Sequence, residues 1–350
     1  MYISEVEKNE IESIFQKSNI DWSIFNNKTI LITGATGLIG STIIHTLCYL
    51  NLYHGYNYLI VAAARSQEKF DNKFGEDEKK FITPVFCNIE DLPKTLTTDH
   101  INIIIHCASP TASKYFVTYP VETIHDSVYG TDAVLEIARN RHVEKTIYLS
   151  TMEVFGERSN NCKVYPNESG SFDTAVVRNS YPLSKLLCEN LCISYANEFG
   201  LNIQVLRLTQ TFGPGIDKND HRIFAEIAFD VINKRDIILK TKGRTERSYL
   251  YVFDAITAIM TLIEKGNSGQ VYIAANENTF CSIYEMSKSV ANKYKIGVKV
   301  EEDNIANRGY ANELHMNLDT SKIQMLGWKP TTDLLSMYEK MINDLIERGD

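Results

Sequence analysis

Three glycines between a hydrophobic strand and a hydrophobic helix constrain the fold of this chain more than any other feature. The segment KTILITGATGLIG spans residues 28–40, with a predicted buried strand over Thr29–Thr33 and glycines at 34, 37 and 40. Gly34 permits a tight turn, Gly37 lets the backbone approach a phosphate, and Gly40 lets helix and strand pack closely. The free N–H groups and positive dipole end of the helix attract negative charge. The segment therefore predicts a binding site for the pyrophosphate of a dinucleotide.

Hydrophobic segments after the glycine turn alternate between short runs typical of strands and longer runs typical of helices. This alternation predicts an α/β fold, a Rossmann-type doubly wound parallel sheet with helices on both faces. The predicted strands are Tyr58–Ala63, Phe81–Phe86, Ile101–His106, Lys145–Ser150, Asn202–Leu208 and Val271–Ala274, and the predicted helices are Ile39–Leu50, Pro120–Arg139 and Pro182–Phe199.

No repeat or linker separates independent domains. Residues 1–27 are predicted to form a helical arm that packs on the main domain, or contacts another subunit. Residues 28–213 are predicted to form the dinucleotide-binding Rossmann domain, to which 247–275 returns. Residues 214–246 and 276–350 are predicted to form a smaller, mixed α/β substrate lobe over the strand ends, where ligands of such sheets bind.

Composition excludes several classes of function. The net charge of −8 and the absence of nucleic-acid motifs argue against nucleic-acid binding. The N-terminus is acidic and lacks the apolar core of a signal peptide, and no apolar run approaches the ~20 residues of a membrane helix. The seven cysteines are scattered, so we expect free thiols, no metal site and a cytoplasmic location.

The end of the second predicted strand informs cofactor choice. NAD-binding folds commonly carry a carboxylate there, on the ribose 2′-hydroxyl. Here Ala63 and Ala64 occupy the position and Arg65 follows, which favours the 2′-phosphate of NADP(H) over NAD(H); a solvated surface arginine is the alternative. Asn88 and Ile89, after the third strand, are candidates to flank the adenine.

A tyrosine and a lysine four residues apart predict the chemistry. Tyr181 and Lys185 lie on one face of a predicted helix, and Thr151 ends a predicted strand. An ammonium beside a phenol favours the phenolate, which would lower the pKa of Tyr181 towards the range of proton transfer. Lys185 can also reach the cofactor ribose. We expect these groups to move a proton on a sugar hydroxyl while a nicotinamide exchanges hydride with the same carbon.

With these residues, the chain from Lys28 onward resembles the extended short-chain dehydrogenase/reductases, a group of nucleotide-sugar epimerases, dehydratases, decarboxylases and ketoreductases. The motifs that carry the resemblance are TGATGLIG, HCASP (106–110), GT (130–131), STMEVFG, YPLSK, RLTQTFGPG (207–215), RSYLYVFDA (247–255) and LDTSKIQMLGWKP (318–330). The stretch from VRNSYPLSK to NDHRIF is most similar to UDP-glucuronate decarboxylases.

The resemblance implies a set of site residues, a nucleotide-diphosphate-sugar substrate and a homodimer formed by the helices over 120–139 and 182–199. Cofactor contacts are expected from Gly34, Thr36, Gly37, Leu38, Ile39, Gly40, Arg65, Asn88, Ile89, Ala108, Ser109, Tyr181 and Lys185. Catalytic roles are expected for Thr151, Tyr181, Lys185 and Glu153, and substrate contacts for Arg178, Gln210, Arg222 and Arg247. Arg247 would bind the substrate diphosphate, and Arg178 is equally compatible with a solvated loop charge.

Two departures from the family pattern bear on the reaction. Met152 stands where dehydratases use Asp and decarboxylases usually Ser, and a thioether donates no proton. This argues against a 4,6-dehydratase and weakens decarboxylation, although Glu153 matches both. Ser127 replaces a frequent Asn, with no assignable effect. A 4-epimerase is marginally favoured over an NADPH-dependent 4-keto-sugar reductase, ahead of a decarboxylase and of a cofactor-sensing protein without catalysis.

Overall fold

The computed structural model describes residues 3–158, 162–302 and 314–349. Its helices are α1 (Glu5–Lys17), α2 (Leu38–His54), α3 (Gln67–Lys73), α4 (Glu76–Lys79), α5 (Leu92–Thr95), α6 (Ser113–Thr118), α7 (Pro120–Asn140), α8 (Ser180–Phe199), α9 (Ile223–Ile232), α10 (Val252–Lys265), α11 (Ile283–Tyr294), α12 (Ser321–Gln324) and α13 (Leu334–Arg348). Short 3₁₀ helices are η1 (Trp22–Phe25), η2 (Ile89–Asp91), η3 (Met152–Phe155) and η4 (Val177–Asn179). The strands are β1 (Thr29–Thr33), β2 (Leu59–Ala64), β3 (Ile82–Phe86), β4 (Ile103–His106), β5 (Lys145–Thr151), β6 (Ile203–Leu208), β7 (Gln210–Phe212), β8 (Ile237–Leu239), β9 (Glu246–Tyr251), β10 (Gln270–Ala274), β11 (Asn276–Ser282), β12 (Val298–Val300) and β13 (His315–Met316).

A parallel sheet forms the centre of the larger lobe. Among the described residues it has seven strands in the order β10-β6-β5-β4-β1-β2-β3. The chain winds from β1 towards β3 on one side and from β4 towards β10 on the other. The order therefore reverses between β1 and β4, and in sheets of this type ligands bind at such a point, at the carboxyl ends of the strands.

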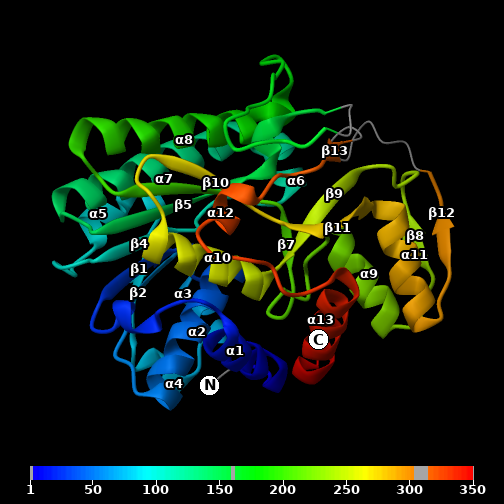
Figure 1. Cartoon of the computed structure of the whole chain (residues 1–350), viewed down its shortest axis with the longest axis horizontal. Coiled ribbons are helices and arrows are strands. Elements are labelled where there is room, and N and C mark those ends of the chain that lie inside the picture. The colour runs from blue at the N-terminus through cyan, green and yellow to red at the C-terminus, as the bar shows by residue number, and fades with distance from the viewer. Residues whose placement is uncertain (1–2, 159–161, 303–313, 350) are drawn as a thin grey trace.

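Helices cover both faces of this sheet because its strands alternate between two hydrophobic layers. Ile30 and Ile32 of β1 belong to one buried cluster with residues of α2 and α10. Leu31, between them, belongs to another cluster with residues of α5 and α7. Figure 1 shows α7 and α8 along one side of the sheet and α2 and α10 along the other. The predicted fold class is confirmed.

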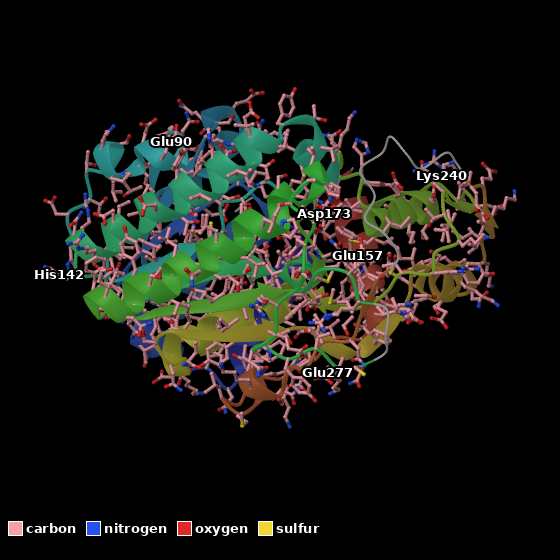
Figure 2. The ribbon with its side chains drawn as sticks, turned by 90° about the horizontal axis from the view of Figure 1, so that it is seen from above. Glu90, His142, Glu157, Asp173, Lys240 and Glu277 are labelled. Atoms are coloured by element: carbon pink, nitrogen blue, oxygen red, sulfur yellow. The ribbon has the colours of Figure 1, made fainter. Side chains whose placement is uncertain are left out.

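A smaller lobe follows β6. Strand β9 pairs with β7, β11 and β13, and β8 pairs with β12. Helices α9 and α11 lie beside these strands at one end of the molecule (Figure 1). Figure 2 places His142 of the larger lobe and Lys240 of the smaller lobe at opposite ends. The predicted domain boundaries remain a prediction. Within the segment 247–275, β9 pairs in the smaller sheet, whereas α10 and β10 return to the larger one.

A buried polar cluster joins the N-terminal arm to the last helix. Ser4 Oγ donates to Asp344 Oδ1 at 2.6 Å, and the amide of Gly215 donates to Asp344 Oδ2 at 2.8 Å. Glu7 lies beside them, and burial raises its pKa. Helices α1 and α13 lie side by side (Figure 1). The arm thus packs on its own chain, and whether it also contacts another subunit stays a prediction.

All the predicted strands and helices are present, and many of them have shifted ends. The strand ends differ from prediction by at most two residues. Helix α2 continues four residues beyond the predicted Leu50, to His54, and ends where Gly55 adopts the left-handed conformation at φ +72°. Glycine is the residue that takes this conformation at least cost, and it commonly ends a helix in this way.

Candidate active site

The glycine turn links β1 to α2. Gly34 has φ +67°, and a Cβ there would lie 2.8 Å from the amide nitrogen of Ala108. A Cβ on Gly40 would collide with the carbonyl oxygen of Gly34, so only glycine lets the helix pack against the turn. Gly37 is exposed at the N-cap of α2, where no side chain caps the helix. The first amides of a 17-residue helix therefore face outward at the switch point, an arrangement that suits a pyrophosphate.

Hydrogen bonds fix the neighbouring strand end. The amide of Ala108 donates to Thr33 Oγ1 at 3.2 Å, and Thr33 Oγ1 lies 2.7 Å from His106 Nδ1. On the other side, His106 Nε2 lies 3.3 Å from Thr131 Oγ1, which donates to the carbonyl of Ser127. Because the Thr131 hydroxyl proton is used, Nε2 is the donor and Nδ1 the acceptor. Burial lowers the pKa of His106 to about 3, so this ring is neutral and holds Ala108 beside the glycine turn.

The residues predicted at the adenosine end follow two adjacent strands. Arg65 follows β2; its side chain is 71 % exposed, and Nη1 lies 3.7 Å from Asp126 Oδ2 of α7. Asn88 and Ile89 follow β3, and Asn88 is exposed. The side chain of Ile89 packs against Gly130 of α7. These residues lie near one edge of the crevice, although Arg65 and Ile89 both contact the protein itself.

The predicted catalytic residues meet at the end of β5. Tyr181, in the first turn of α8, is 6 % exposed and shares hydrogen bonds with Thr151 and Ser109. Lys185 lies one turn further along and is 3 % exposed; its Nζ donates to the carbonyl of Leu149 at 2.8 Å. Since β5 is adjacent to β4, which is adjacent to β1, this cluster lies at the same sheet edge as the glycine turn.

The pKa of Tyr181 differs from our expectation. We expected the adjacent ammonium to lower it, but it is raised, first by burial and then by the charge of Glu153. Lys185 is itself buried, with Nζ 4.6 Å from the ring centroid of Tyr148, and burial lowers its pKa. Desolvation of the phenolate thus outweighs the ammonium, which is bound to a carbonyl rather than to the phenol.

Glu153 and Arg178 form an ion pair beside this cluster. Arg178 Nη2 donates to Glu153 Oε2 at 2.8 Å, and the two side chains are 15 % and 27 % exposed. Arg178 is therefore not a solvated loop charge. Met152 is 5 % exposed, and its sulfur lies 3.2 Å from Thr209 Oγ1, whose proton is donated to the carbonyl of Ser248 at 2.5 Å. It packs in a hydrophobic cluster and presents no proton donor to the crevice.

The other three predicted substrate contacts lie on or near the smaller lobe. Gln210 begins β7 and pairs with Tyr249 of β9. Arg247, on β9, has a buried Nε without a hydrogen-bond partner in the described part of the chain. Arg222, the N-cap of α9, is instead paired with Asp220.

Sequence reasoning missed several residues of this region. It did not single out His106 as the link between strands, Asp126 as the partner of Arg65, or Phe116, which stacks on Tyr181 at 4.1 Å. His106 lies within the HCASP motif, so its position at a strand end was a usable signal. Nothing local indicates that Phe116 and Tyr181 meet, because they lie on separate helices.

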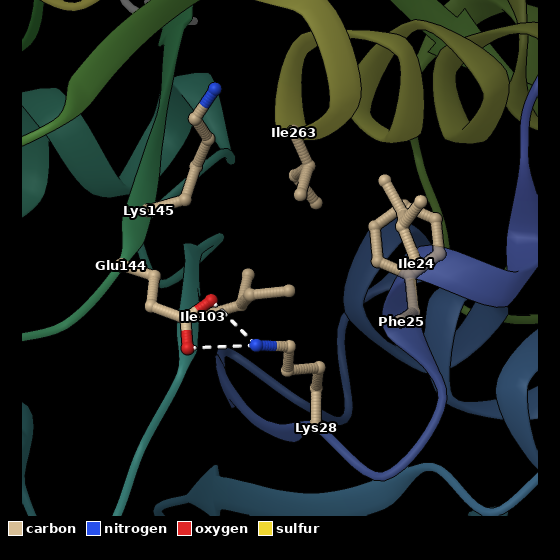
Figure 3. Close-up of a pocket in the computed structure, with 7 residues that line it drawn as sticks. All are labelled: Ile24, Phe25, Lys28, Ile103, Glu144, Lys145 and Ile263. Atoms are coloured by element: carbon tan, nitrogen blue, oxygen red, sulfur yellow. Dashed lines mark hydrogen bonds and ion pairs between the residues drawn. The ribbon is translucent and has the colours of Figure 1, made fainter.

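A separate cavity of about 250 Å³ lies at the opposite edge of the large sheet, lined by Ile24, Phe25, Lys28, Ile103, Glu144, Lys145 and Ile263 (Figure 3). Lys28 is paired with Glu144 at 2.8 Å, and Lys145 donates to the carbonyl of Gly266 at 2.9 Å. Its cations are thus satisfied, and it contains none of the predicted site residues.

Across the described residues, no group of three or more His, Cys, Asp or Glu side chains has the arrangement of a metal site. No helix in the described ranges has the length and apolarity to span a bilayer.

A glycine turn at the switch point, with a buried tyrosine and lysine at the same edge, defines a dinucleotide-dependent enzyme of the Rossmann class. The model of the NAD dependent epimerase/dehydratase family matches residues 30–275, so the chain belongs to this family. It is an enzyme of the extended short-chain dehydrogenase/reductase kind, and its cofactor is a nicotinamide dinucleotide. The resemblance seen in the sequence is confirmed.

Relatives of this chain carry out different reactions. The dTDP-D-glucose 4,6-dehydratase of Homo sapiens is 26 % identical over 316 residues, which cover 87 % of this chain and 85 % of the relative. UDP-glucuronic acid decarboxylase 6 of Arabidopsis thaliana is 27 % identical over 318 residues, covering 88 % and 86 %. The structure of UDP-glucose 4-epimerase from Thermotoga maritima, determined with UDP-glucose, is similar with a TM-score of 0.77 at 20 % identity, covering 92 % of this chain and all of that chain.

Proposed function

We propose that this protein binds a nucleotide-diphosphate sugar and inverts it at C4, as an NAD(P)-dependent 4-epimerase. The observation that carries the proposal is the buried cluster of Tyr181, Thr151 and Lys185 beside the glycine turn. A bound nicotinamide would supply the acceptor and donor of hydride. Tyr181 would exchange the proton of the C4 hydroxyl, Thr151 would hydrogen-bond the same oxygen, and Lys185 would bind the cofactor ribose.

Met152 and Glu153 favour this reaction over elimination and decarboxylation. Loss of a C6 hydroxyl needs a proton donor, and the Met152 side chain is buried and has none. Glu153, which matches the dehydratase and decarboxylase pattern, is engaged by Arg178. A C4 inversion requires neither, so it is the reaction most compatible with these residues. Dehydratase and decarboxylase activities, named for the relatives, remain the outcomes that the substrate test must separate.

The second candidate is an NADPH-dependent reductase of a 4-keto sugar. It is favoured by the absence of a carboxylate at the end of β2 and by Arg65, whose guanidinium suits a 2′-phosphate. We therefore propose a preference for NADP(H) over NAD(H). Binding measurements of NADP(H) and NAD(H) to the wild type and to Arg65→Ala test this preference. An affinity for NADP(H) that is the same in the two proteins would contradict it.

We propose that the substrate diphosphate binds the unpaired Nε of Arg247, with Gln210 and Arg222 close to the sugar nucleotide.

We also propose a cytoplasmic homodimer formed through α7 and α8. Exposed apolar side chains on these helices support the dimer, namely Val121, Ile124, Tyr129 and Leu187. Sedimentation equilibrium of the purified protein tests the dimer, and a monomer at micromolar concentration would contradict it.

Incubation with a panel of UDP-, dTDP-, GDP- and CDP-linked sugars and uronates tests the reaction. An epimerase converts one sugar into its C4 epimer without added NADPH, and NMR of the anomeric protons measures this. A reductase acts only on a 4-keto sugar and consumes NADPH. Release of carbon dioxide from UDP-glucuronate would identify a decarboxylase. No change in any substrate, with and without NADPH, would contradict the proposal.

A further inference from the structure

The phenol of Tyr181 belongs to a stack of three side chains. The rings of Tyr181 and Phe116 are parallel within 4°, with centroids 4.1 Å apart. The guanidinium carbon of Arg178 lies 4.8 Å from the Phe116 centroid. Phe116 comes from α6, Arg178 from η4 and Tyr181 from α8, so three separate segments converge on this stack.

Arg178 also reaches the carboxylate that faces the phenol. It donates to Glu153 at 2.8 Å, and the backbone amide of Glu153 donates to Thr151 Oγ1 at 3.2 Å. The charged groups around Tyr181 are therefore Glu153 on η3, Arg178 on η4 and Lys185 on α8. Of these, Glu153 raises the pKa of Tyr181 and Arg178 lowers it.

We propose that Arg178 is a positioning residue for Tyr181. Arg178 neutralises the charge of Glu153 beside the phenol and holds the ring of Phe116 flat against the ring of Tyr181. The inference rests on the proposed role of Tyr181 as the proton-exchanging group. It assigns Arg178 to the protein's own machinery instead of to the sugar or phosphate. Its Nε has no hydrogen-bond partner in the described part of the chain, so a direct substrate contact is the alternative that the experiment must separate.

The sign of the expected effect follows from the charges. In Arg178→Gln the carboxylate of Glu153 loses its counterion and disfavours the phenolate, so the pKa of Tyr181 rises. In Glu153→Gln the neighbouring negative charge is lost and the pKa falls. The double variant has neither charge and returns towards the wild-type value. Charges at such range shift a pKa by on the order of one unit.

Two measurements on the cofactor-loaded protein test the proposal. The first is the pH dependence of kcat/KM with the sugar substrate. The midpoint of its rise towards the alkaline plateau should move up by about one pH unit in Arg178→Gln and down in Glu153→Gln. Arg178→Lys should restore most of the wild-type profile, because it keeps the charge. The second is the ¹³Cζ resonance of Tyr181 against pH without sugar, assigned by comparison with Tyr181→Phe.

Arg139→Gln is the matched control. Arg139 makes the same two kinds of contact, an ion pair with Glu136 at 3.5 Å and a stack over the ring of Phe199 at 4.0 Å. It lies in the last turn of α7, outside the group of residues around Tyr181. This variant should leave both measurements unchanged. An increase of KM in Arg178→Gln without a change in pH profile would instead identify a substrate ligand, and would overturn the proposal.

The resonance measurement separates this proposal from the proposed function. If no sugar is turned over but the Tyr181 resonance shifts in opposite directions in the two single variants, the epimerase proposal fails and the role of Arg178 stands. If the wild type is active and neither variant moves the resonance or the pH profile, the role of Arg178 is wrong and the epimerase proposal stands.

Discussion

Tyr181 is held in a protonated state by its surroundings in the structure described here. It is 6 % exposed, and burial together with Glu153 raises its pKa. A group that exchanges protons near neutral pH must therefore gain a further positive charge, and an oxidised nicotinamide carries one. At the scale of single residues, the proposed role of Tyr181 therefore predicts that the phenol becomes reactive only when the cofactor is bound.

Replacement of Tyr181 by phenylalanine should abolish turnover while leaving the cofactor bound. The ring and its stack with Phe116 persist, and only the hydroxyl is lost. General acid–base groups contribute on the order of 10²–10⁴ to rate, so kcat should fall by about that factor. Steady-state assays and cofactor titration of the same preparation measure both quantities. Full activity in this variant would exclude the assigned role.

A second residue-scale prediction concerns Asp254 of α10. Its carboxylate accepts hydrogen bonds from the amide of Thr331 at 3.0 Å and of Thr332 at 3.2 Å, yet burial raises its pKa to about 6. A raised acid pKa stabilises the fold below about pH 4 and loses that contribution as pH rises to about 6. The difference from the ordinary value of 3.8 corresponds to about 3 kcal/mol.

The free energy of unfolding in urea, measured between pH 4 and pH 7, checks this for wild type and Asp254→Asn. The wild-type value should fall relative to the variant value by about 2 kcal/mol across that interval, because the unfolded-state carboxyl is already partly ionised at pH 4. Other titrating groups are common to both proteins and cancel in the difference. A difference that stays constant with pH would refute the assignment.

At the scale of elements, the two ends of α2 have different functions. Gly40, in its first turn, leaves no room for a Cβ against the Gly34 carbonyl oxygen. Gly40→Ala should push the helix from the turn and weaken dinucleotide binding by about tenfold or more, or at least ~1.4 kcal/mol. Calorimetric titration of NAD and NADP measures this.

The control variant lies at the other end of the same helix. Gly55 has φ +72°, and a Cβ there meets nothing within 4 Å. Gly55→Ala should cost about 1 kcal/mol of stability through its backbone conformation and leave cofactor affinity unchanged. If both variants lose affinity equally, the close packing at Gly40 is not what shapes the site.

The helices and strands also show which parts of the structure could be predicted from the sequence alone. Periodicity located β1, β4 and α7 because each buries a continuous or regularly spaced apolar face, and the four-residue spacing brought Tyr181 and Lys185 together. It could not show that Met152 turns into the core or that Arg178 meets Glu153. Those contacts depend on how loops after different strands fold over the same edge, which is information that local pattern does not contain.

At the scale of the whole molecule, Asp344 links three distant segments. It joins Ser4 of the arm, Gly215 of the loop after β7 and Arg348 of its own helix, and it is fully buried. Asp344→Ala should cost about 3 kcal/mol, because it leaves buried donors without their acceptor. Urea unfolding measures this.

Glu339→Ala, on the same helix, is the matched control. Its carboxylate is 53 % exposed and pairs with Lys293 at the surface. Exposed ion pairs contribute little, so the change should stay within about 0.5 kcal/mol. A similar loss in both variants would show that the buried cluster holds the arm no more firmly than a surface contact does.

The packing of α1 also has a consequence for synthesis. Its buried residues Ile11 and Ile14 leave the ribosome early, whereas its partners α10 and α13 are made much later. At about 5–20 residues per second, the interval before α13 emerges is roughly 20–70 s. During this time α2 is the one of the three helical partners α2, α10 and α13 of the arm that has already been made. We therefore expect the arm to stay incompletely packed, and open to ribosome-associated chaperones, until α13 emerges.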